Sequence, residues 1–213
     1  MSIRVEDISY IYGKGSPFEK TALSHVDLTI NKGEFIGVIG HTGSGKSTLI
    51  QHLNGLIHPT SGKVTIDGID LAAKTKDAVS KRHSAGMVFQ YPEHQLFEET
   101  VAQDIAFGPK NLGCDEEEVD KRVKSAMRFA GIDYEKFAGR SPFRLSGGQQ
   151  RRVAIAGVIA MHPDFLILDE PSAGLDPIGR REIFSRIWDW YNKGVFSVIL
   201  VSHNMDDLSL IHI

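Results

Sequence analysis

The sequence predicts an α/β fold in which a mostly parallel sheet is covered by helices. Short apolar runs typical of buried strands alternate with helical patterns along most of the chain. Over residues 34–56, one such strand leads through a glycine-rich turn into a helix, which is the setting of a phosphate-binding loop. Residues 100–140 contain helical patterns without a strand between them. We therefore expect one domain over residues 1–213, with an inserted α-helical subdomain at about residues 91–145.

The amino-terminal part supplies mainly strands. Residues 3–12 and 22–30 alternate apolar and polar side chains, and a link containing Gly and Pro separates them. This pattern predicts an N-terminal antiparallel β subdomain. We further expect strands at residues 34–40, 62–68 and 84–89, and a helix at residues 49–56.

The remaining elements alternate again after the helical insertion. Helices are expected at 101–113, 115–132 and 178–191, and strands at 164–170 and 196–203. In the last helix, apolar side chains at positions 183, 184, 187, 188 and 191 mark one face. Trp188 is therefore interpreted as a packing residue, and neither tryptophan is given a function.

The composition is that of an ordinary globular protein. Apolar residues make up 41% of the chain, charged residues 24%, and the net charge is −3. This charge gives no support for a nucleic-acid partner. The single cysteine, Cys114, excludes an internal disulfide and is typical of a reducing compartment. The N-terminus does not resemble a secretion signal, and no apolar run is long enough to span a bilayer.

The strongest motif is a phosphate-binding loop of the form G-x-x-x-x-G-K-[ST]. Its glycines let successive backbone N–H groups point at phosphate oxygens, and the following helix dipole adds to the attraction. The lysine of the motif reaches the β- and γ-phosphates, and the serine hydroxyl coordinates Mg²⁺. The predicted ATP-binding residues here are Gly40, His41, Thr42, Gly43, Ser44, Gly45, Lys46, Ser47 and Thr48.

Two acidic residues follow a second apolar strand, FLILDE. Asp169 lies at the carboxyl end of this strand, where open α/β sheets place their ligands. We expect Asp169 to hold Mg²⁺ and Glu170 to orient and polarise the attacking water. Without a phosphate loop, two such acids would equally suit a solvated turn.

A second anion site is predicted at the start of another helix. Ser146 precedes Gly147, Gly148 and Gln149, and a helix-forming run follows. Free N–H groups and the helix dipole make such an end suitable for a phosphate. The alternative is a helix cap without a ligand.

The motifs occur in the order found in ABC-type ATPases, which the chain resembles over nearly its whole length. They are GHTGSGKS, Gln90 within FQYPE, LSGGQ at residues 145–149, FLILDE, SAGLD and His203 in VSH. The resemblance implies ATP and Mg²⁺ as cofactors, with Lys46, Gln90, Glu170 and His203 as catalytic residues.

The resemblance also assigns individual roles. Tyr12 stacks on adenine, with Tyr10 as the neighbouring alternative. Gln90 senses Mg²⁺, so that Ser47, Gln90 and Asp169 form the metal set. His203 contacts the γ-phosphate. Without the other motifs, it would be interpreted as an ordinary hydrogen-bonded histidine at a strand end. LSGGQ faces the nucleotide of a second ATPase, so that the apparent second anion site is half of a shared one.

A finer resemblance connects the chain with the ATP-binding subunits of energy-coupling factor (ECF) importers for vitamins and metal ions. The segments SPFE and QLFEE indicate the second of the two paired ATPases. The implied partners are another ATPase, identical or paralogous, an integral membrane coupling subunit and a substrate-binding membrane subunit. The implied location is peripheral, at the cytoplasmic face of the cell membrane. Gln90, Leu96 and Phe97 would line or border the groove for the coupling subunit, whereas Leu96 and Phe97 could also be core residues.

The C-terminus departs from the family pattern. After VSHNMDD the family continues through a helix and further strands, whereas this chain ends at LSLIHI. We expect an incomplete C-terminal end, a tail that is not native and reduced solubility or thermal stability.

The function expected from these motifs is ATP hydrolysis that energises import through a membrane partner. The alternative is a soluble ABC ATPase acting on nucleic acid or the ribosome, against which stand the single nucleotide domain and the lack of basic charge. A small-molecule kinase does not explain LSGGQ.

Overall fold

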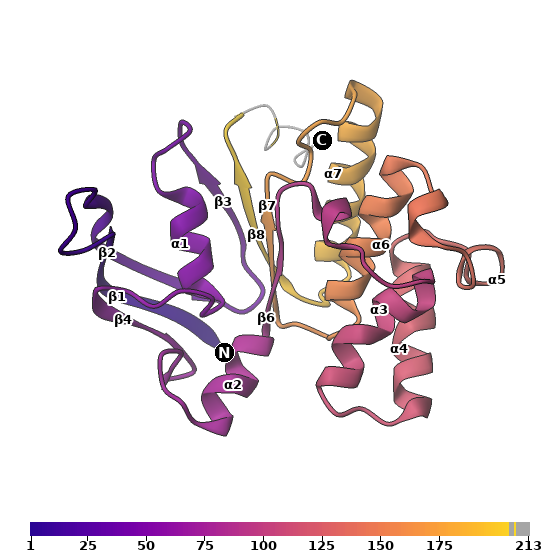
Figure 1. The fold of residues 1–213 in the computed structure, drawn as a ribbon, viewed down its shortest axis with the longest axis horizontal. Helices are drawn as coiled ribbons and strands as arrows, with labels where there is room; N and C mark the ends of the chain where they lie inside the picture. The colour runs from indigo at the N-terminus through magenta and orange to yellow at the C-terminus, as the bar shows by residue number, and fades with distance from the viewer. Residues whose placement is uncertain (205–206, 208–213) are drawn as a thin grey trace.

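The computed structural model describes residues 1–204 and residue 207. The described part contains two four-stranded sheets, ordered β2-β1-β4-β5 and β3-β8-β7-β6 (Figure 1). The expectation for the LSLIHI tail falls on residues outside the described part.

The second sheet is entirely parallel and confirms the predicted core. Its strands are β3 (Phe35–Ile39), β8 (Ser197–Ser202), β7 (Phe165–Asp169) and β6 (Ala85–Val88). The two inner strands, β7 and β8, are buried at every position, as expected of a parallel sheet covered on both faces. Because the strands are parallel, the loops that follow them meet at one edge of the sheet.

The first sheet is antiparallel, as predicted. It contains β1 (Ser2–Tyr12), β2 (Lys20–Asn31), β4 (Ser61–Ile66) and the short β5 (Ile69–Asp70). It lies with the helix α1 (Lys46–Leu53) on one side of the parallel sheet (Figure 1).

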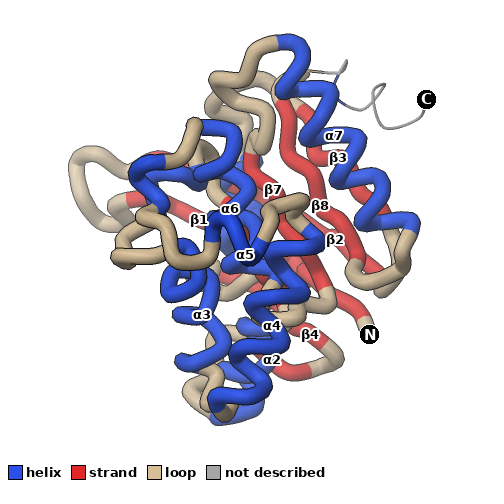
Figure 2. Tube along the Cα trace, turned by 90° about the vertical axis from the view of Figure 1, so that its right-hand side faces the viewer, coloured by secondary structure: helices blue, strands red, loops and turns tan. Residues whose placement is uncertain are grey.

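Alternate side chains of the parallel strands enter two different cores. Leu166 and Leu168 of β7 pack with the helices α3, α4, α6 and α7, whereas Phe165 and Ile167 pack with α1 and the antiparallel sheet. Figure 2 shows α3, α4 and α6 in front of the strands when the molecule is viewed from the helical side. The helix bounds are α3 (Val101–Asn111), α4 (Glu116–Phe129), α6 (Gly147–Ile159) and α7 (Pro177–Asn192).

Several short elements were not predicted. They are the strand β5, the helices α2 (Lys76–His83) and α5 (Tyr134–Phe137), and the 3₁₀ helices η1 (Pro92–Gln95) and η2 (Pro142–Arg144). None of them carries the long apolar periodicity on which the sequence analysis relied. The helix expected at 49–56 begins earlier, at Lys46, because the last residues of the phosphate loop form its first turn.

The predicted apolar face of α7 is confirmed, and Trp188 packs against the core as expected, but the buried face also includes Trp190. Trp190 is the fully buried one, at 1% exposure, and its indole N–H donates to the Phe129 carbonyl at 3.2 Å. Trp188 is only partly buried against the same core. The buried face therefore includes position 190, since α7 packs along both the sheet and the end of α4.

Candidate nucleotide site

A cleft of about 400 Å³ opens at the edge where the parallel strands end. The loops after β3, β6, β7 and β8 all reach it, together with the adjoining ends of β1 and β2. The residues that line it are Tyr12, Lys20, Thr21, Ala22, Thr42, Gly43, Gly45, Lys46, Ser47, Thr48, Gln90, Glu170 and His203. Side chains from six segments far apart in the sequence thus meet in one place.

The phosphate loop depends on glycine at two strained positions. Gly43 and Gly45 have φ of +84° and +90°, which L side chains rarely adopt. At Gly45, a Cβ would also lie 2.6 Å from the Ala22 carbonyl oxygen. The loop can therefore curl tightly against β2, the kind of backbone path by which a phosphate loop surrounds an anion.

Lys46 lies inside this curl. It is 9% exposed, and its Nζ donates to the carbonyls of Gly40 at 2.7 Å and His41 at 3.0 Å. His41 itself is exposed and bonds only with the Thr42 carbonyl next to it. The lysine ammonium is thus held inside the loop by two of its carbonyls and lines the cleft, whereas His41 does not line it.

Asp169 ends the buried strand β7 and is 7% exposed. Burial raises the pKa of its carboxyl, a hydrogen bond from the Ser47 side chain opposes this, the Glu170 charge raises the pKa and the Lys46 charge lowers it. The structure therefore brings together a carboxylate and a hydroxyl oxygen, the ligand types that Mg²⁺ prefers.

Glu170 follows in a left-handed conformation, with φ of +47°. Its backbone N–H donates to the Val201 carbonyl at 3.0 Å. Its carboxylate accepts from Gln90 Nε2 at 3.2 Å and lies 3.1 Å from His203 Nδ1. A non-glycine residue in this region is costly, so the surrounding contacts fix where the carboxylate points.

The two candidate tyrosines differ in their surroundings. Tyr12 is 44% exposed, lines the cleft and places its hydroxyl 3.1 Å from Thr48 Oγ1. Tyr10 packs edge-on against Tyr12 and His52 on the side of the core. Of the two, only Tyr12 presents a ring toward the cleft.

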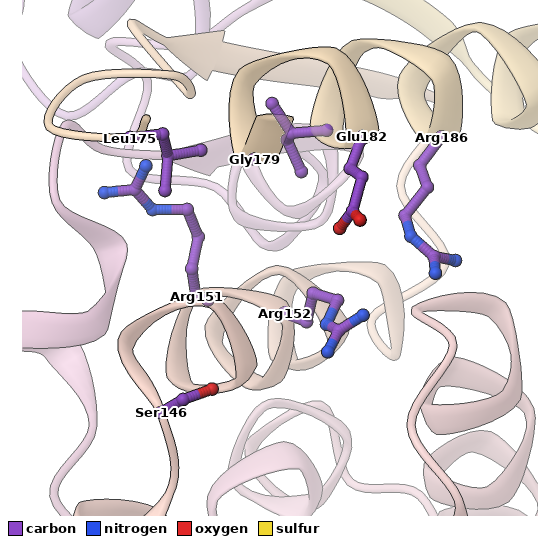
Figure 3. Close-up of a pocket in the computed structure, with 9 residues that line it drawn as sticks. Ser146, Arg151, Arg152, Leu175, Gly179, Glu182 and Arg186 are labelled. Atoms are coloured by element: carbon purple, nitrogen blue, oxygen red, sulfur yellow. The ribbon is translucent and has the colours of Figure 1, made fainter. Parts of the chain in front are cut away.

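The LSGGQ segment lies elsewhere. Ser146 caps α6: its side chain accepts from the Gln149 backbone N–H at 3.4 Å, and the Gln149 side chain accepts from the Ser146 backbone N–H at 3.0 Å. None of residues 146–149 lines the cleft. Ser146 and Gly148 instead border a separate cavity of about 210 Å³ between α6 and α7, which Figure 3 shows.

The glycines of this segment are not needed by the packing of the chain itself. A Cβ built on Gly147 or Gly148 meets no atom within 4 Å, and neither residue has a positive φ. The first turn of α6 is therefore an open helix end, exposed at Gly147 and Gly148 and capped by Ser146 at the Gln149 N–H.

Of the two groove residues expected after Gln90, one is buried and the other is exposed. Leu96 is 6% exposed and belongs to the helical core. Phe97 is 57% exposed and packs edge-on against the exposed ring of Phe107. Only Phe97 is available at the surface.

A buried ion pair beside the site was not predicted from the sequence. Arg151 is 3% exposed and pairs with Glu93. These two residues are 58 positions apart, and in the sequence both look like ordinary surface charges.

The chain is similar to known proteins over nearly its whole length. The family model described as "ABC transporter" matches residues 23–173. The chain is 58% identical over 209 residues to the energy-coupling factor transporter ATP-binding protein EcfA2 of Clostridium tetani, covering 98% of this chain and 73% of the relative. It is 55% identical to EcfA2 of Clostridium perfringens, covering 99% and 74%.

The chain is a member of the energy-coupling factor ABC ATPases.

Solved structures agree with this membership. The cbiO1 protein of Clostridium perfringens, part of the ABC transporter complex cbiONQ, has a TM-score of 0.84 at 38% identity, covering 98% of this chain and 81% of that one. The ATP-binding cassette MJ0796, solved as a dimer with ADP and Pi, has a TM-score of 0.82 at 30% identity, covering 98% and 90%.

As an energy-coupling factor ABC ATPase, the protein binds and hydrolyses ATP, and this hydrolysis energises uptake through a transporter. The alternative of an ABC ATPase acting on nucleic acid is not favoured by these relatives. Among the residues that the structure describes, no helix is long and apolar enough to cross a membrane.

Proposed function

We propose that the cleft binds ATP with Mg²⁺, that Glu170 acts on the attacking water, and that the site becomes complete only when the LSGGQ segment of a second ATPase closes on it. The observation that carries the proposal is the position of the Glu170 carboxylate, held between Gln90 and His203 at the mouth of the phosphate loop.

The phosphate charge is met by fixed groups. The loop N–H groups and Lys46 face the β- and γ-phosphates, and little reorganisation is needed because Lys46 is already in place. Tyr12, which lines the same cleft, offers its exposed ring to adenine.

Ser47 and Asp169 are the residues proposed to hold Mg²⁺, with Gln90 nearby. No group of three or more His, Cys, Asp or Glu side chains forms a metal cluster in the described part of the chain. Two oxygen donors beside a phosphate loop suit Mg²⁺, which usually retains waters and binds substrate phosphates. When bound, Mg²⁺ would neutralise charge on the phosphates.

The hydrolytic step requires positioning more than covalent chemistry. Glu170 orients and polarises the water, and accepts its proton as the water oxygen bonds to the γ-phosphorus and the bond from that phosphorus to the bridging oxygen breaks, which releases ADP. His203 lies beside the Glu170 carboxylate and contacts the γ-phosphate. Gln90 donates to the same carboxylate and connects the site with the segment after β6.

The shared-site part of the proposal is supported by the open helix end at Ser146. Its glycines leave space that this chain does not fill, and a helix end of this kind suits a phosphate. The cassette MJ0796 was solved as a dimer. A second ATPase, identical or paralogous, is therefore the proposed occupant.

The remaining partners are proposed from the same membership. An integral coupling subunit and a substrate-binding subunit would lie in the membrane, and this chain would bind peripherally at its cytoplasmic face. The exposed pair Phe97 and Phe107 is apolar and follows Gln90 in the chain, which makes it the proposed contact with the coupling subunit. Vitamins or metal ions are the proposed class of cargo.

The test replaces Glu170 by Gln in the assembled transporter. Because the amide keeps the shape but cannot accept a proton, we expect turnover to fall by orders of magnitude while ATP binding, measured with a fluorescent analogue, stays intact. Glu135→Gln, at an exposed acid of α5 outside the cleft, is the matched control. Near-normal hydrolysis by the Glu170 variant would refute the assigned role.

A further inference from the structure

Arg151 is a buried arginine that makes four hydrogen bonds. Its Nε and Nη2 donate to the two carboxylate oxygens of Glu93, at 3.1 and 2.9 Å. Nη1 donates to the Pro171 carbonyl at 3.0 Å, and Nη2 also donates to the Ala173 carbonyl at 2.9 Å. Figure 3 shows the side chain extending from α6 toward the turn that contains Leu175.

These bonds join three segments that serve the site. Arg151 lies on α6, five positions after Ser146. Glu93 lies in η1, three positions after Gln90. Pro171 and Ala173 belong to the turn that begins immediately after Glu170.

Glu170, next to Pro171, and Tyr91, two positions before Glu93, have strained backbones. Glu170 has φ of +47° and Tyr91 has φ of +55°. Such conformations persist only where the surroundings over-determine them. The hydrogen bond from Arg151 to the Pro171 carbonyl fixes the backbone immediately after Glu170. The ion pair between Arg151 and Glu93 fixes the segment after Gln90.

The pair is strongly ionic. Burial acts to raise the pKa of the Glu93 carboxyl, but the hydrogen bonds and charge of Arg151 outweigh it and hold that pKa below its usual value. A lysine in place of Arg151 would keep the charge, but its single ammonium could not match the planar fork that meets one carboxylate and two carbonyls.

We propose that Arg151 is a positioning residue for hydrolysis, which holds the Gln90–Glu170 pair in place and ties it to the α6 helix that carries Ser146. This inference rests on the proposed function. Since Ser146 serves the nucleotide of the partner ATPase, Arg151 connects the hydrolytic carboxylate of one site with the phosphate contact of the other. Closure on one nucleotide is thereby transmitted to Glu170 at the second site.

The test uses Arg151→Lys and Glu93→Gln in the assembled transporter, with Arg128→Lys as the matched control at an exposed arginine of α4. We expect kcat to fall on the order of tenfold to a hundredfold, because small misplacements of catalytic groups reduce rates by about this much. The affinity for a fluorescent ATP analogue should stay within about twofold, because neither residue lines the cleft. The Hill coefficient for ATP should also fall toward one, a change that a merely structural role would not produce.

The double variant supplies a second check. If the two residues act as one unit, combining Arg151→Lys with Glu93→Gln should lower kcat little more than either change alone. An unchanged kcat, or an equal loss of ATP affinity and turnover with the Hill coefficient retained, would overturn the proposal. If Glu170→Gln hydrolyses ATP normally, the proposed function fails instead, so the two failures are distinguishable.

Discussion

Replacing Gly148 by alanine should stabilise the chain while impairing its activity. Gly148 is the second residue of α6, its φ is not positive and a Cβ there meets nothing within 4 Å. Alanine reduces the freedom of the unfolded chain at such a position, and the expected gain is about 0.4–1 kcal/mol. For a chain of this size, that gain corresponds to a rise in Tm of roughly 1–4 °C.

The same methyl group should damage the shared site. If a phosphate held by the partner ATPase approaches the N–H groups of this helix end, the space beside Gly148 is needed for that approach. Thermal unfolding without nucleotide gives the first quantity, and ATP turnover of the assembled complex gives the second. A lower Tm would contradict the expected stabilisation, and turnover equal to that of the unchanged protein would refute the view that Gly148 serves a partner's nucleotide.

Two further predictions concern the cleft. Gly45→Ala should destabilise the chain more than Gly43→Ala. Both glycines have a left-handed φ, which costs about 1–2 kcal/mol for a side chain, but only at Gly45 would a Cβ lie 2.6 Å from the Ala22 carbonyl oxygen. Chemical denaturation of the nucleotide-free variants measures the free energy of unfolding, and an equal loss in both variants would contradict this. Mg²⁺ binding should weaken as the pH falls toward the raised pKa of Asp169, because only the carboxylate binds the ion. Burial of the ionised Asp169 carboxylate also destabilises the Mg²⁺-free chain, and this penalty should be relieved as the pH falls through that pKa, since the folded state takes up the proton more readily than the unfolded state. Calorimetric titrations with Mg²⁺ check the first expectation and thermal unfolding without Mg²⁺ checks the second, each at several pH values; the stability of Asp169→Asn should depend less on pH in this range.

Much of the fold could be predicted because its signals are local. The phosphate loop lies between an apolar strand and a helix, and the strand ending at Asp169 is apolar throughout. The two-sheet architecture followed from the contrast between alternating and continuous apolar strands. The short helices α2 and α5 lack such periodicity, and the side of α7 that buries Trp190 depends on where α4 ends.

The site residues divide in the same way. Glu170, Gln90 and His203 follow strands, and a parallel sheet brings such positions together at one edge. Arg151 and Glu93 could not be found from the sequence, because their pairing depends on how α6 packs beside η1. Leu96 and Phe97 are adjacent and both apolar, and only the path of the chain after Gln90 buries one and exposes the other.

The central claim is that this chain supplies one half of each of two shared nucleotide sites. Ser146→Arg tests it most directly, because Ser146 does not line the chain's own cleft, yet an arginine there would fill the open helix end. The measurement is ATP-dependent association with the partner ATPase, by light scattering, in a Glu170→Gln background that prevents turnover. We predict unchanged binding of an ATP analogue and loss of association. Association equal to that of the Glu170→Gln protein alone would contradict the account and leave LSGGQ as a helix cap.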